Sequence, residues 1–224
     1  MSARADIDDA GPEAARAGAQ QAVRDLRGRV RRLGDDGLDL ILRDARSHYA
    51  WADEPISEAE IRALYDVVKM GPTSMNGCPA RFVFVTSKEA KERLAPCVNA
   101  GNVDKMMTAP LTVIVAYDVE FWRELPKLHP HDDRRGVFAD DPAKAETAAF
   151  RNGTLQGAYL IIAARAMGYD VGAMSGFSNA KVDAEFFDGT SLRSNFLCNI
   201  GYADEGALFQ RLPRFTFEEA CTII

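Results

Sequence analysis

Apolar residues along the chain follow two patterns, one with the spacing of a helix and one of short unbroken runs. Ser57 followed three residues later by Glu60 is a capping box, which marks the start of a helix that stops at Gly71. Unbroken apolar runs predict buried strands. The two patterns predict helices over residues 38–48, 57–70, 88–98, 143–167 and 179–187, and strands over residues 82–85, 111–117, 169–174 and 195–200. Helices that alternate with short strands around one sheet indicate an α+β or α/β layered domain.

The first two helices each carry an apolar stripe that we expect to face the core. The two stripes are Leu38, Ile41, Leu42 and Ala45, and Ile61, Leu64, Val67 and Val68.

Two long stretches fit neither pattern. The first 36 residues hold seven arginines and seven acidic residues but few large apolar side chains. We therefore expect residues 1–36 to be a flexible extension, with at most a partial helix over residues 20–33. Residues 118–141 are irregular, and long irregular stretches of compact domains are often lids or binding loops. The folded domain is expected to span residues 37–224.

Composition excludes several classes of protein. The formal charge of −6 has the wrong sign for a protein that neutralises nucleic-acid phosphates. The longest apolar runs are far shorter than the ~20 residues of a membrane helix, so no contact with a membrane is expected. The four cysteines form no CxxC pair and the N-terminus has no signal-peptide pattern, so we expect reduced thiols and a cytoplasmic protein.

Several familiar motifs are missing. The sequence contains neither GxGxxG nor GxxxxGK[ST], which disfavours a Rossmann dehydrogenase and a nucleotide triphosphatase. It has no GxSxG elbow, and its three histidines suggest no Ser-His or Cys-His pair. His129 and His131 have no nearby Cys or further His to complete a set, so we expect no metal site.

Polar clusters that would suit a bound anion and a flat polar ring remain. They are Arg46-Ser47, residues 72–76, Asn102 with Lys105, and Arg211 with Arg214. A guanidinium can donate two hydrogen bonds to a phosphate, and an ammonium adds a point charge. Each cluster taken alone is more often a turn or a solvated charge.

In their order along the chain, these clusters resemble the flavin-dependent nitroreductase superfamily. The resemblance spans residues 38–224 and includes Gly-Pro-Thr-Ser-Met-Asn-Gly-Cys-Pro-Ala-Arg-Phe (71–82), Met-Ser-Gly-Phe (174–177), Asn-Ile-Gly (199–201) and Arg-Leu-Pro (211–213). Within the superfamily the chain is most similar to the malonic semialdehyde reductases, or 3-hydroxypropionate dehydrogenases, of the pyrimidine-utilisation pathway. That likeness rests on runs such as residues 44–48, 149–152 and 211–215.

The resemblance implies a three-layer α+β fold, with a central mixed or antiparallel sheet flanked by helices, in a domain-swapped homodimer that binds FMN between its subunits. Arg46, Ser47, Lys105 and Arg211 would surround the phosphate and ribityl chain, and Asn102 would lie at the polar edge of the ring. The partner subunit would supply Pro72, Thr73, Ser74 and Asn76. The remaining residues that the resemblance assigns to the cofactor are Met174, Ser175, Gly176, Gly201 and Arg214, with the Ser175 backbone N–H donating to flavin N5.

The phosphate end of the site departs from the superfamily pattern. That pattern is Arg-Arg-Ser-x-Arg, whereas residues 45–49 read Ala-Arg-Ser-His-Tyr. Two usual cations are therefore missing, and we expect Arg46, with Arg214 in reserve, to neutralise the phosphate.

The implied activity is an NAD(P)H oxidoreductase that reduces malonic semialdehyde in pyrimidine degradation by ping-pong hydride transfer through flavin N5. No catalytic side chain is assigned, because the flavin carries the redox chemistry. Arg134 or Arg135 is a candidate clamp for the substrate carboxylate. A broad nitro or quinone reductase, and a flavin-binding protein without turnover, are alternatives, and the choice between NADH and NADPH stays open.

Overall fold

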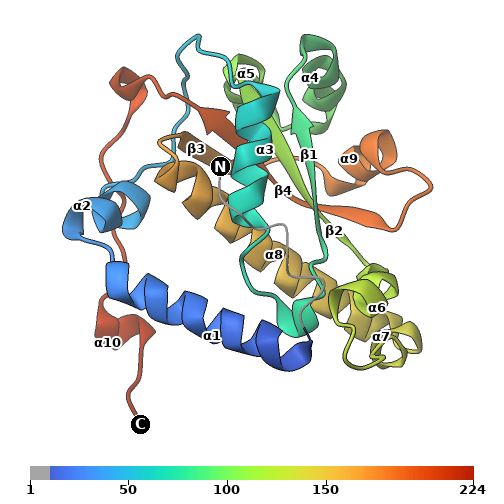
Figure 1. The fold of residues 1–224 in the computed structure, drawn as a ribbon. Coiled ribbons are helices and arrows are strands. Elements are labelled where there is room, and N and C mark those ends of the chain that lie inside the picture. Colours follow the sequence, from blue (N-terminus) through green and yellow to red (C-terminus); the bar gives the residue numbers. More distant parts are fainter. Residues whose placement is uncertain (1–10) are drawn as a thin grey trace.

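The computed structural model describes residues 11–224, and its strands form one four-stranded antiparallel sheet in the order β1-β2-β4-β3 (Figure 1). The strands are β1 (Ala80–Val85), β2 (Leu111–Asp118), β3 (Asp170–Met174) and β4 (Leu192–Gly201). All four predicted strands are present, within a few residues of the expected bounds. The sheet is antiparallel throughout, and parallel pairing is confined to an isolated bridge between Ser47 and Val171.

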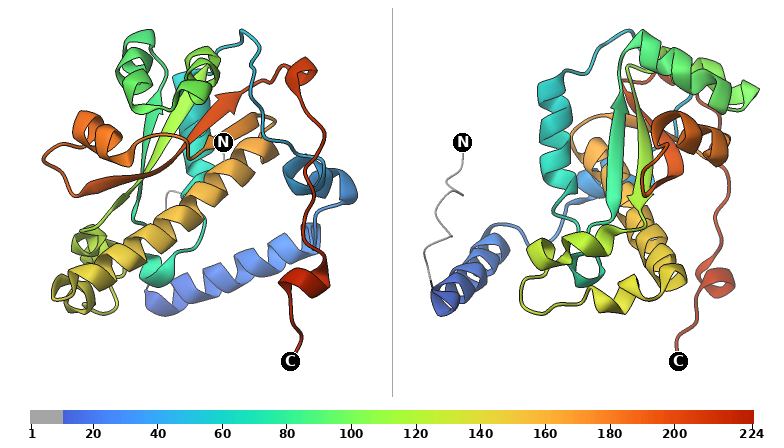
Figure 2. Two further views of the ribbon diagram at one scale, coloured as in Figure 1. Left: turned by 180° about the vertical axis from the view of Figure 1, so that it is seen from behind. Right: turned by 90° about the vertical axis from the view of Figure 1, so that its right-hand side faces the viewer.

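Helices cover both faces of this sheet, which gives the expected three layers (Figure 2). α3 (Glu58–Val68) and α8 (Pro142–Ala166) pack on one face. α4 (Lys88–Leu94) with the 3-10 turn η3 (Ala95–Cys97), α5 (Ala100–Thr108) and α9 (Asn179–Phe186) cover the other. Side chains alternate between the faces along β2, so Val113 and Val115 enter the first core while Ile114 and Ala116 enter the second.

The stretch over residues 118–141 is not wholly irregular. It contains η4 (Phe121–Glu124), α6 (Leu125–Leu128) and α7 (Gly136–Ala139). Phe121, Leu125 and Phe138 anchor these short helices in a third buried cluster, against the start of α8. The apolar residues of this stretch therefore form a small core of their own.

The prediction of a core helix over residues 38–48 is wrong. The helix consists of α2 (Asp35–Leu38) and a π-helical turn η1 (Asp39–Arg43), and Leu42 is 55% exposed. Asp44 ends the helix, and by His48 the chain pairs with β3, where the His48 N–H donates to the carbonyl of Val171 at 3.0 Å. In the second helix the capping box is confirmed and Leu64 and Val68 are buried, whereas Val67 is 51% exposed.

Both ends of the described chain carry exposed segments. α1 (Pro12–Arg29) begins eight residues before the partial helix expected at residue 20, and its described side chains are exposed. After the 3-10 turn η5 (Glu205–Ala207), residues 208–224 form an extended C-terminal arm with one short helix, α10 (Phe217–Ala220). The arm runs past α2, and Phe209, Leu212 and Phe215 are each more than 70% exposed (Figure 1). Within residues 11–224, no helix has the length and hydropathy that a membrane span needs.

Candidate functional site

Four arginines from three distant segments line one hollow of about 530 Å³. Arg46 follows η1, Arg165 lies at the end of α8, and Arg211 and Arg214 belong to the C-terminal arm. Ser47 and Tyr49 are among the other residues that line it. We call this hollow the arginine pocket. The structure thus brings together Arg46, Ser47, Arg211 and Arg214, four of the five residues that the resemblance implied for the phosphate and ribityl chain. The fifth, Lys105, does not line the pocket.

The segment that carries Arg46 is held against the edge strand β3. Besides the backbone bond from His48 to Val171, the Nε2 of His48 lies 3.2 Å from Oδ1 of Asp170. Burial lowers the pKa of His48, and the nearby Asp170 carboxylate opposes this in part. Gly172 allows the close approach, because a Cβ there would lie 2.4 Å from the His48 carbonyl oxygen.

Hydrogen bonds join the three segments that line the pocket. The Arg211 guanidinium donates to the carbonyl of Ala45 at 3.1 Å, and that of Arg46 donates to the carbonyl of Phe209. Arg165 donates to the carbonyl of Arg46 at 3.1 Å. The C-terminal arm is therefore fastened to the rest of the chain through the pocket itself.

The pocket is strongly electropositive. Within residues 11–224, none of the four guanidiniums forms an ion pair with a carboxylate. Burial, with a smaller contribution from Arg211, lowers the pKa of Arg165. Several arginines without carboxylate partners favour a ligand with more than one negative charge, and their planar forks suit a phosphate.

A row of polar groups leads away from the arginine pocket. The Nζ of Lys105 lies 4.9 Å from the ring centre of Tyr49 and donates to Oδ1 of Asn102 at 3.0 Å. Asn102 in turn donates to the carbonyl of Gly176 at 3.3 Å. We call Lys105, Asn102 and residues 174–176 the polar ridge. The sequence left Asn102 and Lys105 outside any predicted element, and the structure places them one turn apart on α5.

Two side chains from other segments hold the polar ridge in place. Trp51 and Asn199 both donate side-chain N–H groups to the carbonyl of Lys105, at 3.1 and 3.0 Å. Asn199 also lies 3.8 Å from the sulfur of Met174. Gly201 is buried, and a Cβ there would meet Pro110 at 2.5 Å and Trp51 at 3.1 Å, so close packing requires a glycine at this position.

The loop over residues 72–76, which includes the 3-10 turn η2 (Ser74–Asn76), lies elsewhere on the same chain. The Ser74 N–H donates to Asn152 at 2.8 Å, and Tyr159 donates to the carbonyl of Pro72 at 2.9 Å. Asn152 lies on α8 thirteen residues before Arg165. At about 1.5 Å per residue Asn152 and Arg165 are roughly 20 Å apart along α8, so Ser74 is held far from Arg165. None of Pro72, Thr73, Ser74 and Asn76 lines the arginine pocket of the same chain.

Sequence reasoning missed Arg165 as a pocket residue. The signal available was weak: one charged residue in the otherwise apolar segment over residues 160–167 of a long helix. In the sequence Tyr49 stood out only because it replaces an arginine of the superfamily pattern. In the structure it lines the pocket, and its ring contacts Lys105 of the polar ridge.

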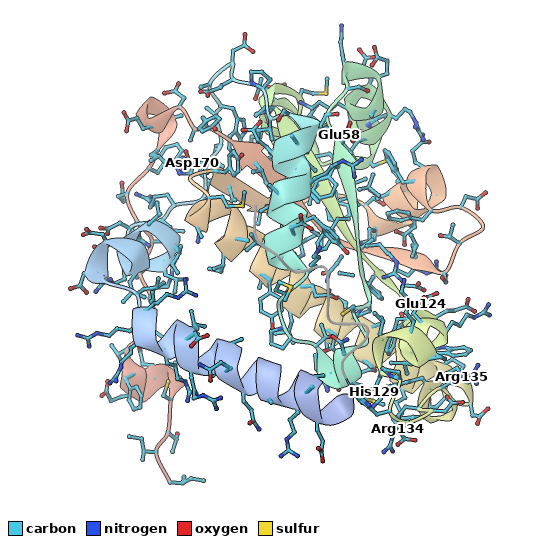
Figure 3. All side chains as sticks on the ribbon, in the orientation of Figure 1. Glu58, Glu124, His129, Arg134, Arg135 and Asp170 are labelled. Atoms are coloured by element: carbon cyan, nitrogen blue, oxygen red, sulfur yellow. The ribbon has the colours of Figure 1, made fainter. Side chains whose placement is uncertain are left out.

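Arg134 and Arg135 lie far from this site. Figure 3 shows both arginines with His129 and Glu124 at one end of the molecule, and Asp170 beside β3 at the other. Arg134 pairs with Asp132, and Arg135 pairs with Asp133 at 2.7 Å, which lowers the pKa of Asp133 to about 2. His129 and His131 have ring centres 6.0 Å apart, and residues 11–224 contain no cluster of three metal-ligating side chains.

Comparison with other proteins gives consistent matches. A relative from Burkholderia lata, provisionally named NADH dehydrogenase/NAD(P)H nitroreductase, is 56% identical over 191 residues, or 85% of this chain and 98% of the relative. A relative from Stenotrophomonas maltophilia with the same provisional name is 54% identical over 186 residues, or 83% of this chain and 95% of the relative.

Solved structures show the same fold at low identity. A provisional nitroreductase from Bacillus subtilis superposes with a TM-score of 0.74 at 17% identity, covering 85% of this chain and all of that one. A provisional nitroreductase from Exiguobacterium sibiricum, solved in complex with FMN, has a TM-score of 0.70 at 21% identity, covering 82% and 96%. The nitroreductase family model matches residues 42–202, which is more than half of the chain. The protein therefore belongs to the nitroreductase family.

Proposed function

We propose that this protein is an FMN-dependent NAD(P)H oxidoreductase that works as a domain-swapped homodimer. The observation that carries the proposal is the arginine pocket, four guanidiniums without carboxylate partners within the described chain, which continues into the polar ridge. The names of the relatives and the FMN in a structural neighbour support the same assignment.

The residues present fit FMN at both of its ends. Arg46, Ser47, Arg211 and Arg214 would hold the phosphate, with Lys105 between phosphate and ring. Asn102, Ser175 and Gly176 would offer amide and backbone groups to the ring edge. When bound, FMN supplies the redox chemistry, because a flavin accepts and returns hydride at N5. The protein contributes orientation, which makes each transfer effectively unimolecular.

A second copy would complete the site. In one chain the loop over residues 72–76 does not line the arginine pocket, and Ser74 is held at Asn152, roughly 20 Å along α8 from Arg165. Phe150 and Leu155 on α8 are 50% and 43% exposed, and the C-terminal arm exposes Phe215 and Ile223 still more. Exposed apolar surfaces of this kind are typical of interfaces. We infer that the arm packs on a second copy, whose loop then faces the pocket.

The proposed substrate is malonic semialdehyde, reduced to 3-hydroxypropionate in pyrimidine degradation. The support is the likeness of residues 44–48, 149–152 and 211–215 to reductases of that pathway. A broad nitro or quinone reductase is the second candidate, and the provisional names of the relatives favour it.

Purified protein tests the proposal in three steps. The protein should be yellow and should elute with the mass of two copies, as measured by light scattering. NADH or NADPH should bleach the flavin without oxygen, and the electron acceptor that restores the colour fastest identifies the substrate. Malonic semialdehyde should outperform nitroaromatics and quinones. A flavin that neither nucleotide bleaches would indicate a binding protein without turnover, and a colourless monomer would refute the proposal.

The candidate carboxylate clamp has its own prediction. Arg135 lies far from the arginine pocket of its own chain (Figure 3), so a clamp would reach the substrate from the second copy. It would come with the loop over residues 72–76, because Asn76 donates at 2.8 Å to the carbonyl of Leu128, which lies in the same stretch as Arg135.

Exposed ion pairs contribute only about 0–1 kcal/mol, so a substrate carboxylate can compete with Asp133 for Arg135. Arg135→Ala should therefore raise KM for malonic semialdehyde roughly 3- to 10-fold and leave KM for a neutral aldehyde unchanged. Arg134→Ala is tested in the same way, and Arg123→Ala, which removes an exposed arginine from the same stretch, is the control. Equal losses on both aldehydes would exclude the clamp.

A further inference from the structure

We propose that Arg165 is a further phosphate-binding residue of the arginine pocket, supplied by α8 rather than by either segment that the sequence pointed to. The inference rests on the proposed function, because it takes FMN as the ligand. Its basis is the position of a partly buried guanidinium that lines the pocket and retains unused donors.

The hydrogen bonds of Arg165 leave donors for a ligand. Nη1 donates to the carbonyl of Ile41 at 3.0 Å, and Nη2 donates to the carbonyl of Arg46 at 3.1 Å. These bonds fix the guanidinium relative to the segment that carries Arg46. A guanidinium has five N–H groups, so three remain available. Within residues 11–224, no other acceptor engages them.

The charge of Arg165 also lacks a partner. A partly buried cation is costly unless an anion compensates it, and no carboxylate of the described residues pairs with this one. Burial acts most on the pKa of Arg165 and lowers it, Cys198 and Asp170 raise it, and Arg211 lowers it by repulsion. Residues 45–49 supply a single arginine, Arg46, where the superfamily pattern has three. A cation from another element could therefore take over part of their role. A phosphate dianion would relieve the repulsion and use the free donors.

A purely structural Arg165 is the competing explanation, since its two bonds to carbonyls alone could hold the Arg46 segment in place. Two variants separate the roles. Arg165→Lys keeps the charge but loses the planar fork, whereas Arg165→Gln keeps amide donors for the carbonyls and loses the charge. Arg62→Gln, on an exposed arginine of α3, is the matched control.

The test is the dissociation constant of flavin-free protein for FMN and for riboflavin, which lacks the phosphate, measured by quenching of flavin fluorescence. Arg165→Gln should bind FMN roughly 10- to 100-fold more weakly than wild type and riboflavin within twofold of wild type. Arg165→Lys should regain most of the FMN affinity. Thermal melting confirms that each variant is folded.

Three outcomes would overturn the assignment of Arg165. They are equal losses for FMN and riboflavin, no loss for Arg165→Gln, and a loss for Arg165→Lys as large as that for Arg165→Gln. The proposed function fails separately, if wild-type protein binds FMN no more tightly than riboflavin. A wild type that prefers FMN, with an Arg165→Gln variant that keeps the preference, refutes Arg165 alone.

Discussion

Replacing Arg46 and Arg211 together by alanine is expected to give a folded, colourless protein that no longer retains FMN. A hydrogen bond to a charged group contributes about 1.5–3 kcal/mol, and each 1.4 kcal/mol changes affinity tenfold. Loss of two guanidiniums should therefore weaken FMN binding by roughly 100- to 10,000-fold. Riboflavin, which lacks the phosphate, should bind the variant nearly as well as it binds the wild type.

The two single variants are needed because these arginines are coupled. Arg211 donates to the carbonyl of Ala45, and Arg46 donates to the carbonyl of Phe209, so each also fastens the C-terminal arm. Residues that share contacts rarely have additive effects. We expect the loss in the double variant to differ from the sum of the single losses.

A matched double variant controls for the change in net charge. Arg62 and Arg93 are exposed and pair with Glu58 and Glu185, and neither lines the pocket. Arg62→Ala with Arg93→Ala therefore removes the same two positive charges outside the pocket. Isothermal titration with FMN gives the affinities, and thermal melting shows whether the fold survives. An Arg46→Ala, Arg211→Ala protein that binds FMN within tenfold of wild type would show that the arginine pocket is not the phosphate site.

Local sequence signals predicted most of the secondary structure. They failed where contacts with distant parts of the chain determine the local conformation. The capping box at Ser57 and the apolar run over residues 111–117 specify their elements by themselves, and both are confirmed. The apolar spacing of residues 38–48 fitted a core helix equally well. There the chain instead pairs with β3, as in the bond from His48 to Val171. These residues are 123 positions apart in the sequence, so no local pattern could predict the contact.

The residues of the candidate site also divide into those that the sequence indicated and those that only the tertiary structure shows. Arg46, Ser47 and Arg211 were found because their runs resemble a family, and the structure brings them together. Arg165 could not be found in this way, since its partners Ile41 and Arg46 lie 124 and 119 residues away. A charged residue near the end of an apolar helix is also what a solvated helix terminus looks like.

Gly172→Ala is expected to weaken FMN binding, although Gly172 lies on β3 and does not line the arginine pocket. A Cβ at this position would lie 2.4 Å from the His48 carbonyl oxygen and 3.3 Å from Trp51. The first contact is with backbone and is shorter than the 3.0 Å below which Cβ contacts essentially never occur, so the segment that carries Arg46 and Ser47 must move away from β3. Overpacking of this kind typically costs about 1–3 kcal/mol of stability.

The effect on FMN should exceed the effect on the fold. Gly172 lies within β3, whose pairing with β4 does not depend on the His48 segment, so the sheet can survive while the pocket opens. We expect FMN affinity to fall at least about tenfold in a protein that still melts cooperatively, with riboflavin affected less. Gly136→Ala is the control, because a Cβ there would meet nothing within 4 Å. Unchanged FMN affinity in a folded Gly172→Ala protein would mean that the position of Arg46 against β3 does not set the geometry of the phosphate site, and that the C-terminal arm and α8 alone are sufficient to form it.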